Sequence, residues 1–534
     1  MRMVQAKRFA LFAFAALLLN TVFGGAVASL EPNWVTPTKV TKEITNPDGS
    51  KVNASISEPD IDKDGKGDIL AITNLMDIAF NDKGEILGWY PKLVKGTDNK
   101  GNYERHETLV MKDARSSVVL GMDGKPLEAG VAQPPKLEIG GDPNNRVLTA
   151  TFKYTAGGSS VTKIYTINAR QLTLNLDLTV TGLSNYQIEF VGLGNGKPVM
   201  KALESGKKEP LEIGETASSG EVKTAVYASM QCCRSLLGSQ GQSFLVKSQN
   251  SSSTLPVKLG IRTQSRKTDK GTENFDVSTI TVGLTGNQNK LALYGGFDEL
   301  IRFNQEGYYA LPGLFKPNIF GQISLVLVKI LEFLNNYTHS WGLAIVAFTL
   351  LLRLALWPLL QTQFRSTAEM QAIQPQVKEL QAKFKDNPQK QQEELMKLYK
   401  EHGTNPFSGC LPILLQMPVL VVLWRVFQNL EFNQGFLWLR DLSLPDPFYI
   451  LPVLYVAVNV GQLWLSTRNT PDMFKQQLVM QFIFVYIVLS FPAGVTLYWV
   501  LSTAIAIGQQ WFITNKINAE MALKGKIVKV AKAK

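Results

Sequence analysis

The chain has 534 residues, a formal net charge of +11 and a mean hydropathy near zero. This length exceeds one ordinary domain, and the average hides a division, because residues up to about 310 are polar and long apolar blocks dominate the rest. Lys and Arg gather beside the apolar blocks, as they do in cytoplasmic loops, which excludes DNA as the reason for the basic charge and favours a membrane protein. Three cysteines are too few for a disulfide framework.

The N-terminus carries Arg2, Lys7 and Arg8 ahead of an apolar stretch. Residues 26–28 offer a small-residue cleavage pattern, so the segment 1–29 is either a cleaved signal peptide or a retained membrane helix. In both interpretations the basic flank stays in the cytoplasm and the next segment is exported.

Residues 30–310 are predicted to form this exported part as an all-β domain. The stretch LTLNLDLTV at 172–180 alternates apolar and polar residues, as a half-buried strand does. Similar stretches, separated by turn residues, lie at 146–155, 162–169, 278–286 and 290–296. Many short strands with turn signals predict an antiparallel sandwich.

Two short motifs of the exported part resemble ligand-binding loops. The stretch 192–198 hints at a phosphate loop, but Pro198 stands where a Ser or Thr must reach magnesium, so a turn is predicted. The acidic run 60–68 begins like a calcium loop, but Ala71 replaces the bidentate glutamate and a solvated turn is favoured. The sequence therefore predicts no cofactor, no metal site and no catalytic residues.

Five apolar blocks follow at 341–360, 411–430, 449–466, 477–492 and 494–514, and some of them are shorter than the ~20 residues that cross a bilayer. With residues 1–29 they predict a polytopic bundle of six transmembrane helices. The flanking charges place both termini in the cytoplasm and the β domain outside. Before these blocks, the segment 319–336 is apolar but carries Lys329 and Glu332, which predicts an amphipathic helix lying in the outer interface.

Residues 362–408, between the first two blocks, read as a cytoplasmic two-helix hairpin. Ile373, Val377 and Leu380 recur at helical spacing, the pattern breaks at Pro388, and apolar periodicity then resumes. The alternatives are a plain solvated connector and a segment with a partner-docking or gating role.

Arg353 stands out because it lies inside an otherwise uncharged block. A charge there costs at least ~2.5 kcal/mol on insertion scales. It lies seven residues before Leu360, about 10 Å from the cytoplasmic end of its helix. The residues alone allow two readings: the guanidinium snorkels to the headgroups, or it lines a polar groove, with Thr349 one turn earlier on the same face.

From about Leu293 to Ile513, the sequence resembles the YidC/Oxa-type membrane protein insertases. The stretches that carry the resemblance are WGLAIVAFTLLLRLALWPL, AEMQAIQPQVKELQAKFKDNPQKQQEELMKLYKEHGTNP, GCLPILLQMPV, FLWLRDLS and FPAGVTLYWVLS. A β domain after one N-terminal helix is like the YidC branch of Gram-negative inner membranes, in which the first helix is retained.

The resemblance implies five core helices around a hydrophilic groove that is open to the cytoplasm and to lipid. It places Arg353 in the position of the groove arginine, near Thr349, and implies that Tyr498 and Trp499 lie across the groove. Asn459 and Gln462 are candidates for further groove polarity.

The implied function is insertion and folding of inner-membrane proteins, alone or with the Sec translocon. The implied partners are newly made membrane proteins, the Sec translocon, membrane lipids, and a ribosome bound through the hairpin and the basic tail at 515–534. The rival reading is a secondary transporter in which Arg353 binds an anionic solute. Transporters tend to show internal repeats with broken helices, and no such pairing is visible in the sequence.

Overall fold

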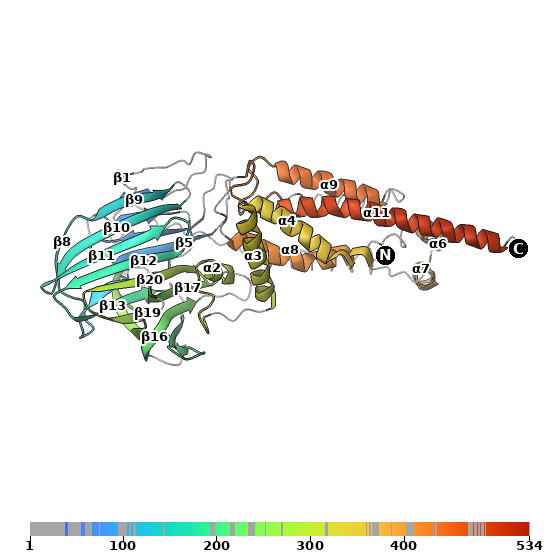
Figure 1. Ribbon diagram of the computed structural model, residues 1–534. Helices are drawn as coiled ribbons and strands as arrows, with labels where there is room; N and C mark the ends of the chain where they lie inside the picture. The colour runs from blue at the N-terminus through green and yellow to red at the C-terminus, as the bar shows by residue number, and fades with distance from the viewer. Residues whose placement is uncertain are drawn as a thin grey trace. The chain divides into compact units, whose positions relative to one another are not determined.

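A computed structural model describes residues 38–40, 55–58, 67–73, 75–93, 104–105, 108–110, 114–142, 145–192, 198–213, 219–232, 241–250, 252–268, 271–314, 319–358, 360–362, 365, 373–385, 387–401, 411–430, 432, 435–439, 441–467, 474, 478, 481, 485 and 488–532. The predicted N-terminal helix at 1–29, residues 60–66 of the acidic run, residues 193–197 and most of the block 477–492 lie outside these residues. The chain divides into a unit up to Leu325, which also includes Asn429–Asn433, and a unit formed by the remainder (Figure 1).

The first unit is built from two antiparallel sheets. The six-stranded sheet contains, in spatial order, β1 (Thr38–Val40), β2 (Ser55–Glu58), β3 (Ile69–Ile72), β4 (Met76–Phe80), β5 (Ile86–Leu93) and β6 (Glu104–Arg105). The fourteen-stranded sheet contains β7 (Val118–Leu120), β8 (Ala129–Ala132), β9 (Lys136–Asp142), β10 (Asn145–Ala156), β11 (Ser159–Asn168), β12 (Thr173–Thr181), β13 (Asn185–Gly192), β14 (Val199–Glu204), β15 (Leu211–Ile213), β16 (Ser219–Cys232), β17 (Gln242–Ser248), β18 (Leu255–Thr268), β19 (Gly271–Thr285) and β20 (Gln288–Phe297). The prediction of an all-β domain is confirmed.

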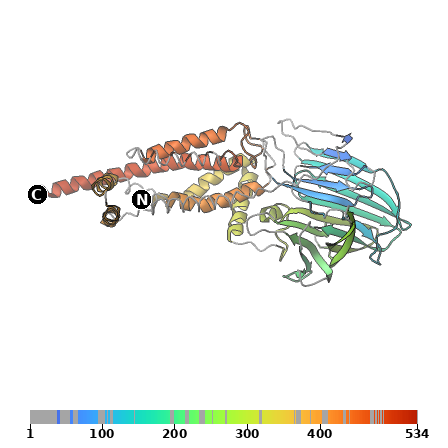
Figure 2. The same cartoon turned by 180° about the vertical axis from the view of Figure 1, so that it is seen from behind.

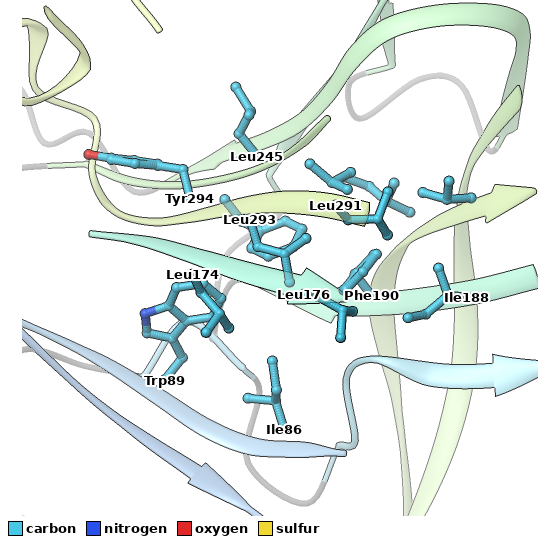
Figure 3. Packing of buried hydrophobic residues seen from close by; sticks show 14 of the residues in the cluster. Ile86, Trp89, Leu174, Leu176, Ile188, Phe190, Leu245, Leu291, Leu293 and Tyr294 are labelled. Carbon is cyan, nitrogen blue, oxygen red and sulfur yellow. The ribbon is translucent and has the colours of Figure 1, made fainter. Parts of the chain in front are cut away.

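The alternation read from the sequence is the physical reason for this packing. Along β12, buried residues alternate with half-buried ones, and Leu174 and Leu176 point into the core. Figure 3 shows Leu174 and Leu176 beside Ile86 and Trp89, which come from the smaller sheet. One apolar core therefore lies between the two sheets, and strands such as β11 and β12 bury every second side chain in it.

The helix α2 (Leu300–Gln305) is attached to the β strands by a buried carboxylate. Glu306, at the C-terminal end of α2, accepts hydrogen bonds from the backbone N–H of Leu172 (2.8 Å) and from the hydroxyl of Thr173 (2.7 Å). Burial raises the pKa of the Glu306 carboxyl above its ordinary value, although these hydrogen bonds favour the charged form. The helix α2 thus belongs to the folded β unit.

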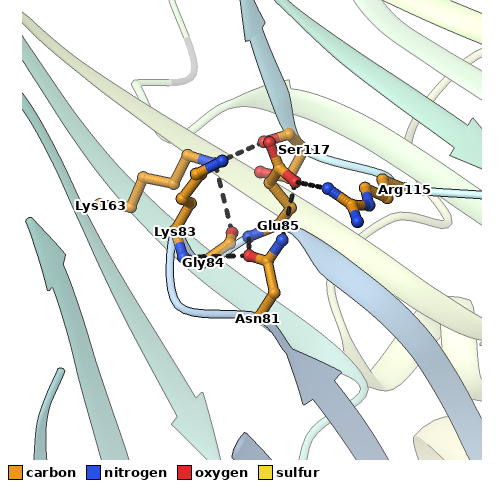
Figure 4. Close-up of polar contacts among 7 residues, drawn as sticks. All are labelled: Asn81, Lys83, Gly84, Glu85, Arg115, Ser117 and Lys163. Carbon is orange, nitrogen blue, oxygen red and sulfur yellow. Dashed lines mark hydrogen bonds and ion pairs between the residues drawn. The ribbon is translucent and has the colours of Figure 1, made fainter. Parts of the chain in front are cut away.

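A fully buried lysine interrupts the apolar core at the turn between β4 and β5. The ammonium of Lys163, on β11, donates to the carbonyls of Ser117 (2.6 Å) and Gly84 (3.3 Å), as Figure 4 shows. It also lies 5.7 Å from the ring centroid of Tyr154. The hydroxyl of Tyr165 donates to the same Gly84 carbonyl at 2.7 Å. Ser117 itself has a φ of 65°, a conformation that residues other than glycine rarely adopt. Lys163 and Tyr165 therefore join the two sheets through backbone carbonyls.

The charged residues around Lys163 come from the turn between β4 and β5 and from Arg115, which precedes β7. Asn81 donates to the carboxylate of Glu85 at 2.8 Å, and Arg115 lies 3.6 Å from that carboxylate. Burial lowers the pKa of the Lys163 ammonium to about 8, an effect that Glu85 opposes and Lys83 reinforces. Burial dominates because the amine has been removed from water on all sides.

We expect the free energy of unfolding of the β unit to rise by about 2 kcal/mol between pH 7.5 and 9.5. In this window the unfolded chain keeps the lysine proton while folded Lys163 loses it, because its pKa is depressed from 10.5 to about 8. Stability therefore rises with pH. The measurement is urea unfolding of the full chain at both pH values, with Lys163→Met as the matched variant.

The rise should disappear in Lys163→Met, and an equal rise in both proteins would contradict the assignment to Lys163. The pH range ends at 9.5 because burial raises the pKa values of Tyr154 and Tyr165 above their ordinary value. Each of these groups keeps its proton longer in the folded state, so each lowers stability as the pH rises above about 10.

The second unit is helical. Its described helices are α3 (Ile319–Thr338), whose first turns are grouped with the first unit, α4 (Trp341–Ala355), α6 (Gln374–Lys383), α7 (Pro388–Glu401), α8 (Leu411–Asn429), α9 (Ile450–Thr467) and α11 (Ala493–Lys532). The helices α4, α8, α9 and α11 run side by side in both views, and α11 packs against α4 and α9 (Figure 1, Figure 2). Among the described residues, α3 alone is long and apolar enough to cross a membrane by length and composition, and α4 and Ile450–Leu465 are shorter apolar helices.

The last helix differs in extent from the predicted segment. The block predicted to end at 514 is part of α11, which continues to Lys532, because the basic tail is rich in the helix formers Ala and Lys. Between α3 and α4 the chain turns at His339, whose φ is 52°. The helices α6 and α7 contact each other through an apolar cluster that contains Ile373, Val377 and Leu398.

Candidate functional site

The guanidinium of Arg353 is bound to the neighbouring helix α11. Arg353 lies twelve residues into α4, and its Nε and Nη2 both donate to the hydroxyl oxygen of Ser502, at 2.8 Å and 2.5 Å. Ser502 is 1% exposed, and Arg353 is half-buried. The charge is therefore held between α4 and α11 inside the helical unit.

The contact between α4 and α11 follows a line of residues on each helix. The lines, with spacings of three and four residues, are 349 and 353 on α4 followed by 356 and 360 beyond its last residue, and 502, 506, 509 and 513 on α11. Leu360, Ala506 and Ile513 form an apolar cluster with Leu356. We call the polar members of the two lines, Thr349, Arg353, Ser502 and Gln509, the polar seam.

Two members of the polar seam are buried and form no hydrogen bond with Arg353 in the part of the chain that the structure describes. Thr349 is fully buried, and its hydroxyl donates to the carbonyl of Ile345 at 2.7 Å, within its own helix. Gln509 is 7% exposed, and its side-chain oxygen has no hydrogen-bond partner among the described residues. The seam thus contains polar atoms that are withdrawn from the outside of the bundle.

The sequence predicts Tyr498 and Trp499 near Arg353, and the structure shows an interaction with Arg353 for Tyr498. Tyr498 is 3% exposed and lies close enough to Arg353 to interact with it electrostatically. Trp499 packs instead against Tyr455 of α9, with ring centroids 4.9 Å apart, and stacks on Phe491 at 5.9 Å. Consecutive helical residues point about 100° apart, so these two rings face different neighbours.

Asn459 and Gln462 are half-buried on α9. The Asn459 amide donates to the carbonyl of Tyr455 at 2.8 Å, one turn earlier on its own helix. In the part of the chain that the structure describes, neither residue forms a hydrogen bond with Arg353.

The net charge of the site is determined by Arg353 and its neutral hydrogen-bond partner, Ser502. Within the described ranges no carboxylate forms an ion pair with Arg353, and Ser502 is neutral. An arginine stays protonated in proteins, so the site carries a full positive charge. A carboxylate about 4 Å away would gain about 4 kcal/mol at an effective dielectric constant of 20. Over the same ranges, no three His, Cys, Asp or Glu side chains gather as metal ligands.

Ser502 is the residue that sequence reasoning missed. It lies 149 residues from Arg353, and contact across two helices depends on how they are rotated against each other. One signal was present, because Ser502 follows Tyr498 by four residues and so lies on the same face of the helix.

The family model described as "60Kd inner membrane protein" matches residues 333–520, the helical part of the chain. A curated membrane protein insertase YidC from Deinococcus radiodurans is 40% identical over 411 residues, which cover 76% of this chain and 90% of that protein. The chain belongs to the YidC family of membrane protein insertases. This membership confirms the family resemblance and replaces the solute-transporter reading.

Two further YidC insertases match over shorter stretches. The protein from Thioalkalivibrio sulfidiphilus is 33% identical over 264 residues, 48% of this chain and 45% of that protein. The protein from Marinobacter nauticus is 41% identical over 206 residues, 38% of this chain and 36% of that protein. These YidC relatives are named as insertases, in agreement with the prediction that the chain is not an enzyme.

The fold agrees with that of a solved YidC. A crystal structure described as an active YidC insertase with its first transmembrane domain resolved matches with a TM-score of 0.52 and 21% identity, covering 94% of this chain and 98% of that chain. The YidC fold therefore extends over the β unit as well as the helical unit, and the YidC family places the chain in the bacterial inner membrane.

Proposed function

We propose that this YidC-family chain inserts newly made proteins into the inner membrane by offering Arg353 as an uncompensated positive charge within the bilayer. The observation that carries the proposal is the hydrogen bonding of the guanidinium to Ser502, a neutral hydroxyl, with no carboxylate beside it among the described residues. A polar or acidic tail of the client lodges near Arg353 while its hydrophobic segment moves into lipid. Thr349, Tyr498 and Trp499 stay in the proposal as further residues of the client-binding groove.

The cost of bringing a client carboxylate into the bilayer and the attraction of that carboxylate to Arg353 are of similar size. Bringing a carboxylate to the middle of a bilayer costs about 2.5–3.5 kcal/mol on insertion scales, and attraction to Arg353 at about 4 Å returns an amount of the same order. Burial of about 20 apolar residues at ~25 cal/mol per Å² then drives the client forward. No nucleotide is required by this account.

The contact with Ser502 supports a groove charge over a snorkelling arginine. A snorkelling side chain extends along its helix until its head reaches the headgroups. The guanidinium of Arg353 is instead directed at a buried hydroxyl on a different helix. The insertion of matched clients with acidic and neutral tails, described below for Arg353 variants, tests the proposal.

The proposal includes six membrane helices with both termini in the cytoplasm. The helices α4, α8, α9 and α11 supply four of them, and segments 1–29 and 477–492 supply the others. The support is the alternation of flanking charge, because the basic segments 362–408 and 515–534 then share one side of the membrane. The β domain at 30–310 lies on the periplasmic side, as in a Gram-negative-type cell.

We place α3 in the outer interface rather than across the bilayer. Its exposed apolar residues recur at spacings of three and four: Ile319, Ile323, Val326, Ile330, Phe333 and Tyr337. Lys329 and Glu332 lie near the middle of the helix, where a spanning helix would pay about 2.5 kcal/mol or more for each charge. An interfacial position leaves the apolar stripe in lipid and lets both charges reach water.

The proposed partners beyond clients are the Sec translocon, lipids and the ribosome. The hairpin at 362–408 and the tail at 515–534 are rich in lysine, which attracts ribosomal RNA and anionic lipid. Most charged side chains of α6 and α7 lie at exposed or half-exposed positions around the apolar cluster, where such contacts would form.

Deletion of residues 38–314 is expected to leave most insertion activity intact, because the polar seam lies wholly in the helical unit. The deletion extends past β20 so that α2 is removed with the strands that Glu306 binds. Ending it at 290 would leave that carboxylate and the apolar face of α2 without partners. The measurement is insertion of a single-span client into vesicles that contain the purified variant.

A matched deletion of residues 38–338, which also removes α3, should lose activity, since α3 seats the helical unit in the interface. If the variant with the shorter deletion were present in normal amounts and inserted no client, the proposal that the helical unit inserts clients without the β unit would be wrong.

A further inference from the structure

The two hydrogen bonds between Arg353 and Ser502 use one side of the guanidinium. A guanidinium is planar and rigid, and the hydrogens of Nε and Nη2 that point the same way form its side edge. Both of these nitrogens donate to the Ser502 hydroxyl, at 2.8 Å and 2.5 Å. The orientation of the guanidinium plane is therefore fixed by a residue on α11.

The guanidinium also has an end edge, formed by Nη1 and the second hydrogen of Nη2, which the Ser502 hydroxyl does not occupy. Among the residues that the structure describes, Arg353 has no hydrogen-bond acceptor other than Ser502. The two parallel N–H groups of this end edge are the fork that binds a carboxylate in a bidentate manner. The site thus has one edge occupied by a neutral hydroxyl and a second edge that suits an anion.

We propose that Ser502 is a positioning residue, which holds the side edge of Arg353 so that the end edge is presented to a carboxylate of the client. The proposal rests on the proposed function of Arg353 and specifies how its charge is delivered. Arg353 has a long side chain with many rotamers, and ordering it before the client arrives removes that entropic cost from the binding step. Because the hydroxyl is neutral, it orients the guanidinium without cancelling its charge.

A purely structural role is the alternative. A hydrogen bond between membrane helices contributes about 0.6 kcal/mol on average, and Ser502 could serve only to join α4 and α11. Such a role affects the stability of the bundle and therefore acts on every client. Positioning of Arg353 affects only those clients whose tails carry a carboxylate.

The experiment uses full-length protein in vesicles and two client proteins that differ only in whether their translocated tail is acidic or neutral. Ser502→Ala should lower insertion of the acidic tail by about five- to tenfold, the size of the cost of ordering one long side chain during binding, and leave the neutral tail unchanged. Ser502→Thr keeps the hydroxyl and should restore acidic-tail insertion. Thr503→Ala is the matched control, because Thr503 is equally buried and makes no hydrogen bond with Arg353 in the described residues.

Ser502→Asp gives a second, independent test. Its carboxylate would occupy the guanidinium as an internal counterion, so acidic-tail insertion should fall to the level of Arg353→Ala while the neutral tail is still inserted. This outcome does not require the bundle to lose stability, which is checked by the thermal unfolding of each variant in detergent.

Three results would overturn the proposal, and they differ in whether the function proposed for Arg353 fails with it. If Ser502→Ala lowers acidic and neutral tails equally, Ser502 joins helices and does not position Arg353. If Ser502→Ala and Ser502→Asp have no effect while Arg353→Ala does, the function proposed for Arg353 stands and the positioning role fails. If Arg353→Ala also has no effect on acidic tails, the proposed function fails together with the positioning role.

Discussion

Arg353→Ala should reduce insertion of clients with acidic translocated tails by about 10- to 100-fold and leave clients with neutral tails nearly unchanged. The attraction that is lost amounts to about 1.4–3 kcal/mol after screening by water in the site, and each 1.4 kcal/mol corresponds to tenfold. Arg353→Lys should retain much of the activity on acidic tails, because a positive charge remains. Insertion of the two matched tails into vesicles, normalised to the amount of each variant, provides the measurement.

If Arg353 instead snorkels to the headgroups, Arg353→Ala is not expected to reduce insertion. Its removal would take away an insertion cost and leave every client unaffected. Equal insertion of acidic tails by Arg353→Ala and by the parent protein would therefore exclude the groove-charge mechanism for this chain.

Helix-breaking prolines in the hairpin should also have a large effect. Leu380 on α6 and Leu395 on α7 pack against the cluster of Ile373, Val377 and Leu398 that holds the two helices together. A proline in a helix interior costs about 3 kcal/mol or more, which exceeds what this small cluster can offset. We expect Leu380→Pro and Leu395→Pro to lower insertion of ribosome-delivered clients by more than about fivefold.

The matched control for these two variants is Gln389→Pro. Position 389 is the second residue of α7 and is exposed, and the first turn of a helix does not use its N–H groups within the helix. This variant should insert clients as the parent does. Unchanged insertion by Leu380→Pro and Leu395→Pro would show that the hairpin is a connector and not a docking surface.

Strands such as β11 and β12 could be predicted because their sequences have a period of two, and the segment 172–180 became β12 with alternate residues buried. Lys163 lies at an inward position of such a strand, between the buried residues Val161 and Tyr165. Sequence could not reveal its burial, since lysine is almost never buried without partners and its partners are backbone carbonyls of distant turns. Tertiary contacts determine such positions.

Arg353 could be found from sequence because a charge in an apolar block is anomalous by itself. Its partner Ser502 could not, since a serine in a membrane helix is common and the register between α4 and α11 is set by packing along the whole contact. The prediction that Tyr498 and Trp499 both line the groove stays a prediction. Neighbours in a helix diverge by about 100°, and the structure shows an electrostatic interaction with Arg353 for Tyr498 and ring contacts with Tyr455 and Phe491 for Trp499.

The continuous helix α11 gives the basic tail a property that a flexible tail would lack. It extends without interruption from Ala493 to Lys532, 40 residues or about 60 Å at 1.5 Å per residue. Ser502 and Lys532 are thus separated by about 45 Å along one rod. A partner bound at the far end of α11 is therefore held at a set distance from Arg353 and at a set angle about the helix axis. Rotation of α11 by such a partner would also rotate the Ser502 hydroxyl to which Arg353 donates.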